Sequence, residues 1–346
     1  MAAPPEPRSG RRHTPLIALT LGDPAGVGPE VVAKALAQAD VRAAADLVVV
    51  GDTAVLERAF ALTGADLRAV RVAAPADPVA DGGVGVYEDE PADGLADLPY
   101  GRVSAAAGAA AVAWATTAGR LAVEGRVDGV VTAPLNKEAA HLAGHAEMGH
   151  QEIYQALTGA ERVMTMLLTP GLRVVHLTTH RSLREACDAV TRENVLAALR
   201  LTHDFFAGHG IPEPRLAAAA LNPHGGEAGL MGAEETEAIG PAVEDARELG
   251  IDATGPVPAD TVFNQAIDGA FDGVLAMYHD QGHIAIKVHD WSRSVTMNIG
   301  LPFLRTSVDH GTAFDIAGRG IADPAGMIEA VRLAAQLART GSLIAT

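Results

Sequence analysis

The sequence predicts an α/β fold whose sheets are largely parallel. Short apolar runs alternate with longer segments of helical composition, and this alternation is typical of parallel strands joined by helices. With 346 residues, the chain is long enough for two domains or one large one. Hydrophobic residues make up 48% of the chain but aromatic residues only 4%, so Ala, Val, Leu and Ile must build the core.

The first part of the chain alternates strand and helix. Apolar residues 16–21 predict a strand that runs into the glycine-rich stretch 22–29, and Pro29 suits the first turn of a helix over residues 29–37. Further apolar runs predict strands, with helices between them. The strands are expected at residues 47–50, 70–73 and 129–132, and the helices at 53–62 and 105–123.

The second part continues the alternation. Residues 163–168 and 172–177 are rich in strand-forming residues and could pair across the turn sequence at 169–171. Strands are also expected at 216–221 and 273–278, and each runs into a loop that contains a histidine. Helices are expected at residues 183–189, 192–206, 234–249 and 325–339.

The charge and the cysteine content narrow the possible partners and location. The formal net charge is −17, and an acidic surface repels phosphate backbones and anionic lipids, so we expect no nucleic-acid or membrane partner. The single cysteine, Cys187, allows no internal disulfide and fits the reducing cytoplasm. Residues 1–13 are rich in Pro and Arg and predict a disordered tail, not a signal peptide.

Three histidines that follow apolar runs give the strongest indication of function. They are His180 in Leu-Thr-Thr-His, His224 in Leu-Asn-Pro-His-Gly-Gly-Glu and His279 in Met-Tyr-His-Asp-Gln-Gly. Imidazole is the commonest protein ligand of transition metals, and three imidazoles with one open position are typical of a catalytic divalent metal site. A single loop histidine is more often only hydrogen-bonded, but three in equivalent settings favour a shared metal site.

Glycine-rich loops and a few cations suggest an anionic ligand. The 22–29 stretch could bind a phosphate through backbone N–H groups, but its spacing is not the dinucleotide fingerprint, and a tight turn explains it equally well. Lys137, Lys287 and Arg305 lie in Gly/Pro/His-rich segments of an otherwise acidic chain. That placement favours binding of a phosphate or carboxylate over solvated surface charge.

Carboxylates near the histidines are further candidates for catalytic or orienting roles. Asp280 directly follows the third histidine, and Asp260 lies in Pro-Val-Pro-Ala-Asp. Either could orient a histidine, complete a metal shell or act as a base, while Asp260 could equally cap a helix that begins near Val262. Asp315 lies among the small residues of 309–320, where a carboxylate could accept both ribose hydroxyls of an adenosine.

Together these motifs resemble the 4-hydroxythreonine-4-phosphate dehydrogenase (PdxA) family. The matching segments occur in the family's order and extend over nearly all of the chain after the tail. They are Leu-Gly-Asp-Pro-Ala-Gly-Val-Gly-Pro-Glu at 21–30, Thr-Ala-Pro-Leu-Asn-Lys-Glu at 132–138, Gly-His-Gln-Glu at 149–152, Thr-Thr-His at 178–180, Leu-Asn-Pro-His-Gly-Gly-Glu at 221–227, Pro-Ala-Asp-Thr at 258–261, Met-Tyr-His-Asp-Gln-Gly at 277–282 and Gly-Leu-Pro-Phe-Leu-Arg-Thr-Ser-Val-Asp-His-Gly-Thr-Ala at 300–313.

The resemblance implies two α/β domains with largely parallel sheets flanking a cleft, similar to the isocitrate and isopropylmalate dehydrogenases. Residues 14–135 and 305–346 would form the cofactor-side domain, and residues 136–304 a second domain with the metal and substrate residues. The resemblance also implies a homodimer with active sites at the subunit interface.

The family oxidises the secondary alcohol of a small phosphorylated hydroxy acid with NAD, and the β-keto acid formed then loses carbon dioxide. The resemblance therefore implies that His180, His224 and His279 hold one divalent metal, which the residues leave open as Zn, Co, Ni, Mg or Mn. The base that takes the hydroxyl proton also stays open among Asp260, Lys137 and a metal-bound water.

Ligand contacts follow from the matched positions. The predicted substrate contacts are His150, Gln151, Lys287, Thr296, Asn298 and Arg305. The predicted NAD contacts are Asp309, His310, Gly311, Asp315 and Gly318, and Asp315 would favour NAD over NADP.

Two positions depart from the biosynthetic members of the family. Position 151 is Gln where those enzymes usually have Thr, and position 296 is Thr where they usually have Asn, with Asn298 nearby instead. This pattern resembles the catabolic branch, which oxidises 4-phospho-D-threonate or 4-phospho-D-erythronate. Pyridoxine biosynthesis and sugar-acid catabolism thus both stay open as the pathway.

A zinc hydrolase is the alternative from another class of function. Three imidazoles with an open position and nearby carboxylates also suit the activation of water. The 309–320 segment favours the dehydrogenase, because a hydrolase needs no adenosine site. A non-catalytic metal-binding scaffold is disfavoured by the polar, Gly-rich neighbours of the histidines.

Overall fold

A computed structural model describes residues 14–89, 92–146 and 149–344. The chain divides into two compact units: unit 1 comprises Met1–Arg162 and Leu301–Thr340, and unit 2 comprises Val163–Gly300 and Gly341–Thr346. Residues 136–162, expected in the second domain, belong to unit 1. The expected disordered tail at 1–13 lies outside the described residues.

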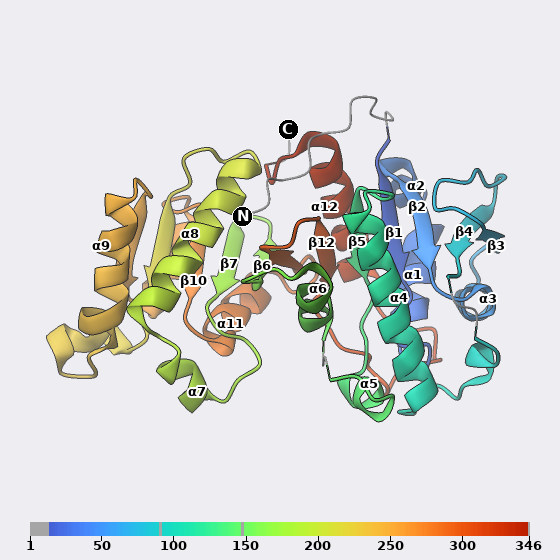
Figure 1. Ribbon diagram of the computed structural model, residues 1–346, viewed down its shortest axis with the longest axis horizontal. Coiled ribbons are helices and arrows are strands. Elements are labelled where there is room, and N and C mark those ends of the chain that lie inside the picture. The colour runs from blue at the N-terminus through green and yellow to red at the C-terminus, as the bar shows by residue number, and fades with distance from the viewer. Residues whose placement is uncertain (1–13, 90–91, 147–148, 345–346) are drawn as a thin grey trace. The chain divides into compact units, whose positions relative to one another are not determined.

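Unit 1 is an α/β structure whose described strands all run parallel, in the order β3-β4-β2-β1-β5-β12 (Figure 1). Its strands are β1 (Leu16–Thr20), β2 (Asp46–Val50), β3 (Arg68–Val72), β4 (Gly83–Tyr87), β5 (Gly129–Thr132) and β12 (Arg305–Val308). Its helices are α1 (Gly28–Ala37), α2 (Ala39–Ala44), α3 (Thr53–Thr63), the 3₁₀ turn η1 (Leu95–Asp97), α4 (Ala105–Val123), α5 (Lys137–Leu142), α6 (His150–Thr158) and α12 (Ala325–Thr340).

Unit 2 contains a mixed sheet in the order β11-β6-β7-β10-β8-β9. β7, β10, β8 and β9 run parallel, whereas β6 is antiparallel to both of its neighbours. Its strands are β6 (Met164–Thr169), β7 (Leu172–His176), β8 (Leu216–Ala219), β9 (Ala253–Val257), β10 (Gly273–Ala276) and β11 (Val295–Ile299). Its helical segments are α7 (Leu183–Asp188), α8 (Arg192–Gly208), η2 (Pro223–Gly229), the π-helical η3 (Glu235–Ile239), α9 (Gly240–Glu248), α10 (Ala259–Ile267) and α11 (His279–Asp290).

Local signals explain where several elements begin and end. The Asp52 side chain accepts a hydrogen bond from Val55 N at the start of α3, and Gly64 ends that helix in the left-handed conformation. A capping box between Ser182 and Glu185 begins α7. The buried residues of the strands are largely Ala, Val, Leu and Ile, as the low aromatic content predicts.

The predicted α/β class is confirmed, and so is the expected pairing of the two β-rich segments, since β6 and β7 form an antiparallel hairpin. One local expectation was wrong: the third histidine does not lie in a loop but begins α11. Its polar first turn and Gly282 gave no helical periodicity. Strand β4 was missed because glycines interrupt it, and β9 because a glycine and a proline do; β11 and β12 were also not expected.

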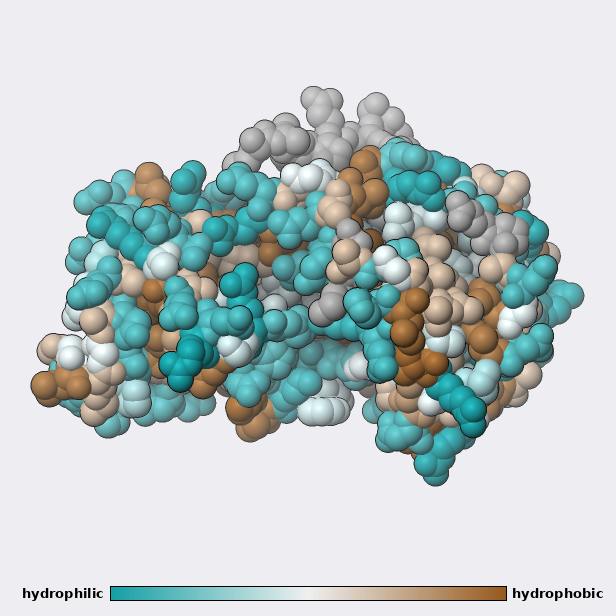
Figure 2. All heavy atoms as spheres, turned by 60° about the horizontal axis from the view of Figure 1, so that its bottom comes forward, coloured by the Kyte–Doolittle hydropathy of each residue, from teal (hydrophilic) through white to brown (hydrophobic). Residues whose placement is uncertain are grey.

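The face of the molecule drawn in Figure 2 is largely hydrophilic, with hydrophobic side chains in small separate patches. No helix in the described ranges is both long and apolar enough to cross a membrane.

Candidate functional site

In unit 2, predicted site residues follow the carboxyl ends of neighbouring parallel strands. His180 comes after β7, His279 after β10, His224 after β8 and Asp260 after β9, and these strands are adjacent in the order β7-β10-β8-β9. Because the carboxyl ends of parallel strands meet at one edge of a sheet, that edge carries all four residues. Ligand sites in α/β folds typically form at this edge.

Hydrogen bonds join the segments that carry His180 and His279. Leu177 N donates to the carbonyl of Ala276 at 2.8 Å, and Thr178 Oγ1 donates to the carbonyl of Met277 at 2.9 Å. These bonds extend the contact between β7 and β10 beyond the strands. The centroids of the two imidazole rings lie 6.0 Å apart.

Gln281 ties the first turn of α11 to two strands. Its Oε1 accepts a hydrogen bond from Met277 N after β10, and its Nε2 donates to the carbonyl of Ala220 after β8, each at 2.8 Å. The start of the helix that bears His279 is therefore fixed relative to the strand that leads to His224.

Carboxylates set the tautomers of two of the histidines. His279 Nδ1 lies 2.7 Å from Asp280 Oδ1, and His224 Nδ1 lies 3.1 Å from Glu227 Oε1. A carboxylate accepts a hydrogen bond, so Nδ1 carries the proton and Nε2 keeps its lone pair. This pattern is typical of metal-binding histidines, whose second ring nitrogen is usually bonded to a carboxylate or carbonyl.

His279 is supported from behind by a second histidine that sequence reasoning missed. The ring of His283 stacks on that of His279 at 3.6 Å and 12°, and its Nδ1 donates to the His279 carbonyl at 3.0 Å. The i, i+4 spacing on one helix face was the available signal. Behind His283 lies His176, whose pKa burial lowers to about 3.

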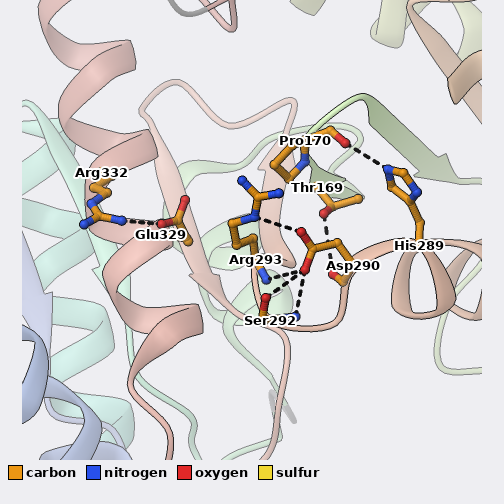
Figure 3. A network of polar contacts seen from close by, with 8 residues as sticks. All are labelled: Thr169, Pro170, His289, Asp290, Ser292, Arg293, Glu329 and Arg332. Atoms are coloured by element: carbon orange, nitrogen blue, oxygen red, sulfur yellow. Dashed lines mark hydrogen bonds and ion pairs between the residues drawn. The ribbon is translucent and has the colours of Figure 1, made fainter. Parts of the chain in front are cut away.

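The opposite end of α11 is anchored on the β6–β7 turn (Figure 3). His289 Nε2 donates to the carbonyl of Pro170 at 3.0 Å. Asp290 accepts hydrogen bonds from Ser292 and Arg293, which close the chain after the helix. With both ends held, α11 can position His279 rigidly.

The segment that carries His224 has an unusual backbone. Each residue from 224 to 229 has a positive φ, including the non-glycine residues His224 (53°), Glu227 (47°) and Ala228 (56°). We call this segment the His224 turn. Left-handed backbone costs a non-glycine residue on the order of 1–2 kcal/mol, so this turn stores strain.

The His224 side chain is 66% exposed at the surface of unit 2. Within the ranges that the structure describes, no three His, Cys, Asp or Glu side chains lie close enough together to hold a metal ion. The backbone thus brings the three histidines to one edge of the sheet, but their side chains do not converge on one point. Metal binding stays a prediction.

Both carboxylates that sequence reasoning singled out in unit 2 are exposed. Asp280 contacts His279 as described, which favours the orienting role among its predicted roles. Asp260 does not cap a helix: α10 begins at Ala259, and its N-terminal flank, Pro258, makes no side-chain capping bond. The capping alternative for Asp260 is therefore wrong.

Arg305 is a buried cation of unit 1. It is 5% exposed, and its Nη2 donates to Thr132 Oγ1 at 2.5 Å, while Thr132 Oγ1 donates to Ser307 Oγ at 3.0 Å. Burial lowers the pKa of Arg305 to about 10, so the guanidinium stays charged at neutral pH. A buried charge of this kind is suited to an anionic ligand.

Two aromatic residues on α6, His150 and Tyr154, belong to the surroundings of Arg305. Burial, and then the charge of Arg305, lower the pKa of His150 well below its usual value, so its imidazole is neutral. His150 Nε2 and the hydroxyl of Tyr154 are buried, and neither has a hydrogen-bond partner in the described part of the chain. Buried polar atoms without partners need an explanation, and a ligand would supply one.

The remaining predicted substrate and catalytic residues are spread over both units. In unit 1, Lys137 begins α5 and Gln151 lies in the first turn of α6. In unit 2, Thr296 and Asn298 lie on β11, and Lys287 Nζ lies 4.8 Å from the centre of the exposed Trp291 ring. Asn298 is buried, so its amide faces the interior of the protein.

The two glycine-rich loops of unit 1 pack against each other. Val27 N donates to the carbonyl of Thr312 at 3.0 Å. A Cβ on Gly22 would lie 2.3 Å from the carbonyl oxygen of Pro134, and one on Gly28 would lie 2.4 Å from that of Leu21. Protein backbone fills the space beside these glycines, which supports the tight-turn interpretation over a dinucleotide fingerprint.

The predicted NAD contacts lie in the same region of unit 1. Asp315, His310 and Gly311 are exposed, and Asp309 is half-buried. Gly318 has a φ of 77°, and a Cβ there would lie 2.3 Å from Cδ2 of Tyr100. Glycine is thus required at 318 for packing, while the carboxylate of Asp315 remains accessible to a ligand.

Known proteins match the chain along most of its length. The family described as "Pyridoxal phosphate biosynthetic protein PdxA" matches residues 43–334. A relative from Cupriavidus necator, named D-threonate 4-phosphate dehydrogenase, is 45% identical, covering 94% of this chain and 98% of its own. A relative from Geobacter metallireducens, named 4-hydroxythreonine-4-phosphate dehydrogenase, is 44% identical, covering 94% and 96%.

A solved structure agrees with both the sequence match and the fold. The 4-hydroxythreonine-4-phosphate dehydrogenase from Klebsiella pneumoniae is 42% identical, with a TM-score of 0.87 over 94% of this chain and 98% of that chain. These relatives are all named dehydrogenases, which supports an oxidoreductase. The hydrolase alternative has no counterpart among them.

Proposed function

This chain belongs to the PdxA family, and from that membership we propose that it is a metal- and NAD-dependent dehydrogenase of a small phosphorylated hydroxy acid. The observation that supports the proposal is that His180, His279 and His224 follow neighbouring parallel strands at one edge of the unit 2 sheet. A purely structural role would not require three histidines at the carboxyl ends of adjacent strands.

One divalent metal would be held by His180, His224 and His279. The carboxylates that keep the Nδ1 protons of His279 and His224 in place leave Nε2 of each ring to coordinate it. Imidazole ligands favour zinc or cobalt, and added carboxylate and substrate oxygens would admit magnesium or manganese. Once bound, the metal would supply positive charge that acidifies the substrate hydroxyl and stabilises the negative charge that develops during decarboxylation.

NAD would accept the hydride, and residues 309–320 would bind its adenosine half. Asp315 is exposed, so its carboxylate is free to accept the two ribose hydroxyls and to repel a 2′-phosphate. Gly318, in the same segment, packs directly on the Tyr100 ring.

Arg305, His150 and Lys287 would bind the anionic groups of the substrate. Arg305 supports this role because its guanidinium is buried and charged and contacts the Thr132 hydroxyl. His150 is neutral and its Nε2 is unpartnered in the described structure, so it can exchange a hydrogen bond with a phosphate or a hydroxyl.

Oxidation removes a hydride from the alcohol carbon to NAD and a proton from its hydroxyl. Asp260 is our candidate for the group that takes this proton, because it is exposed and follows β9, the strand next to the one that leads to His224. The contact of Asp280 with His279 favours an orienting role for it instead, and Lys137 is the second candidate. The β-keto acid then loses its carboxylate as carbon dioxide.

D-threonate 4-phosphate is the favoured substrate. A 45% identical relative carries that activity in its name, and Gln151 and Thr296 depart from the biosynthetic pattern. The second candidate is 4-hydroxythreonine 4-phosphate, which the names of a 44% identical relative and of a solved structure support. We further propose, from family membership, a cytoplasmic homodimer with active sites at its subunit interface.

The test is NADH formation by protein reconstituted with zinc, cobalt, magnesium or manganese. D-threonate 4-phosphate, 4-phospho-D-erythronate and 4-hydroxythreonine 4-phosphate are compared by kcat/KM, and carbon dioxide is measured alongside. Higher kcat/KM for D-threonate 4-phosphate supports the favoured assignment, whereas preference for the amino acid makes Gln151 and Thr296 tolerated variants of a biosynthetic site. Equal activity after complete metal removal would refute the metal requirement.

A further inference from the structure

We propose that Glu235 is the positioning residue of His224: its buried carboxylate holds the His224 turn in the left-handed conformation that presents the imidazole. The inference rests on the proposed function of His224 as a metal ligand. It assigns a role to a residue that lies outside the predicted site.

The carboxylate bonds to the chain directly before His224. Glu235 Oε1 accepts hydrogen bonds from Leu221 N at 2.8 Å and from Asn222 N at 2.7 Å, and Oε2 accepts one from Asn222 Nδ2 at 2.9 Å. Glu235 is 3% exposed, so these bonds are shielded from water. Hydrogen bonds from N–H groups to a carboxylate are among the stronger hydrogen bonds in proteins.

The same carboxylate also contacts the turn from inside. A Cβ on Gly226 would lie 2.6 Å from Glu235 Oε2, so only the hydrogen of a glycine fits there. Gly226 has a φ of 77° and is buried, whereas its neighbour Glu227 is exposed. Glu235 therefore fixes the turn at its entry and at its centre.

In the outer part of the loop, Met231 N donates to the carbonyl of Gly226 at 3.2 Å and Leu230 N to that of Glu227 at 3.3 Å, while Asn222 Nδ2 also donates to Glu234 Oε2 at 2.7 Å. Leu230 and Met231, which follow the turn, are 87% and 47% exposed. Strained backbone persists only where the surrounding contacts hold it in place. Here the buried side of the turn faces the Glu235 carboxylate. Glu235 is itself the first residue of a π-helical turn, a local structure that is frequent at functional sites.

The experiment compares Glu235→Gln and Glu235→Ala with Asp272→Asn. The control residue, Asp272, binds the chain at the opposite end of β8 from Glu235. Its Oδ2 accepts a hydrogen bond from Arg215 N at 2.8 Å, just before β8 begins. Asp272 also accepts two hydrogen bonds from the Arg215 side chain at 3.0 Å, so its replacement removes a carboxylate-to-backbone bond and an ion pair without a change at the His224 turn.

Three quantities are measured for each variant: the Kd for Zn²⁺ of the metal-stripped protein, the Tm without metal, and hydrogen exchange of residues 221–230. Glu235→Ala is expected to raise the metal Kd about 10- to 100-fold, the usual effect of removing a residue that orients a ligand. Glu235→Gln should give a smaller increase, since one amide oxygen can still accept. Both should speed exchange in residues 221–230, and Asp272→Asn should change neither the metal Kd nor the exchange of these residues.

Unchanged metal affinity in both Glu235 variants would overturn the inference, and so would an equal loss in Asp272→Asn, which would mean general destabilisation. Gly226→Ala disturbs the same contact from the side of the turn and should reproduce the loss of affinity for Zn²⁺. Failure of the proposed function looks different: His224→Ala would then bind Zn²⁺ as tightly as the wild type, while the hydrogen-exchange effect of Glu235 would remain.

Discussion

Asp23 provides a quantitative test of the structure of unit 1. It follows β1 and is fully buried, with Oδ1 accepting a hydrogen bond from Ala25 N at 2.8 Å. Its Oδ2 is buried and has no hydrogen-bond partner in the described ranges. Burial therefore raises the pKa of Asp23 from 3.8 to about 6, although the bond from Ala25 opposes part of that rise.

The sign of the pH effect follows from where the proton is held. Between 3.8 and about 6 the folded protein keeps the proton on Asp23 and the unfolded chain does not, so protonation favours folding. Stability from this group is fully present below 3.8 and is lost as the pH rises through about 6. A shift of about two pH units corresponds to about 3 kcal/mol.

The perturbation is Asp23→Asn, which removes the ionisation and keeps the shape. The free energy of unfolding of unit 1 is measured by urea denaturation across this pH window for wild type and variant. We expect the wild type to lose about 3 kcal/mol relative to the variant over the window. Asp128→Asn, which removes a carboxylate bonded to Leu16 N at the start of β1, controls for a lost carboxylate–backbone bond.

A difference between wild type and Asp23→Asn that stays constant with pH would refute the reasoning. It would mean that the carboxyl ionises at its usual pKa in the folded protein, and hence that water or a cation reaches Oδ2.

Three further predictions test the site. Asp315→Ala should weaken NAD binding and narrow its advantage over NADP in fluorescence titrations; an unchanged cofactor preference would remove Asp315 from the cofactor site. His283→Ala should raise the metal Kd about 10-fold, because it removes the ring stacked on His279. His209→Ala, which removes a similarly stacked and carbonyl-bonded histidine after α8, should leave the metal Kd unchanged, and equal effects would contradict a local role for His283. Gly318→Ala should lower the free energy of unfolding by about 1–3 kcal/mol, measured in urea, since Ala would clash with Tyr100; an unaltered value would contradict the close packing of Gly318 on that ring.

The sequence predicted the α/β class and the strands that lead to the histidines because apolar runs and glycine-rich stops are local signals. It could not predict that β7, β10 and β8 are neighbours, since strand order depends on contacts between distant segments. That order is what brings His180, His279 and His224 to one edge.

Other features of the site could not be predicted because their residues depart from the usual sequence preferences of helices and turns. Glycine disfavours helices, yet Gly282 lies inside α11. Glycine is required at this position, because a Cβ there would lie 2.3 Å from His176 Nε2. Glu235 resembles a surface residue of a helix in the sequence, but the N–H groups of Leu221 and Asn222 stabilise its carboxylate in the interior. The left-handed His224 turn has no periodicity to detect, and only its three glycines hinted at it.

The most direct test of the proposed metal centre is calorimetric titration of Zn²⁺ into metal-stripped wild type and into His180→Ala, His224→Ala and His279→Ala, with NAD binding measured in each. We predict one metal site per chain in the wild type, its loss in each variant, and NAD binding that is largely intact throughout. Metal binding that survives all three substitutions would contradict the assignment of these histidines and, with it, the proposed catalytic centre.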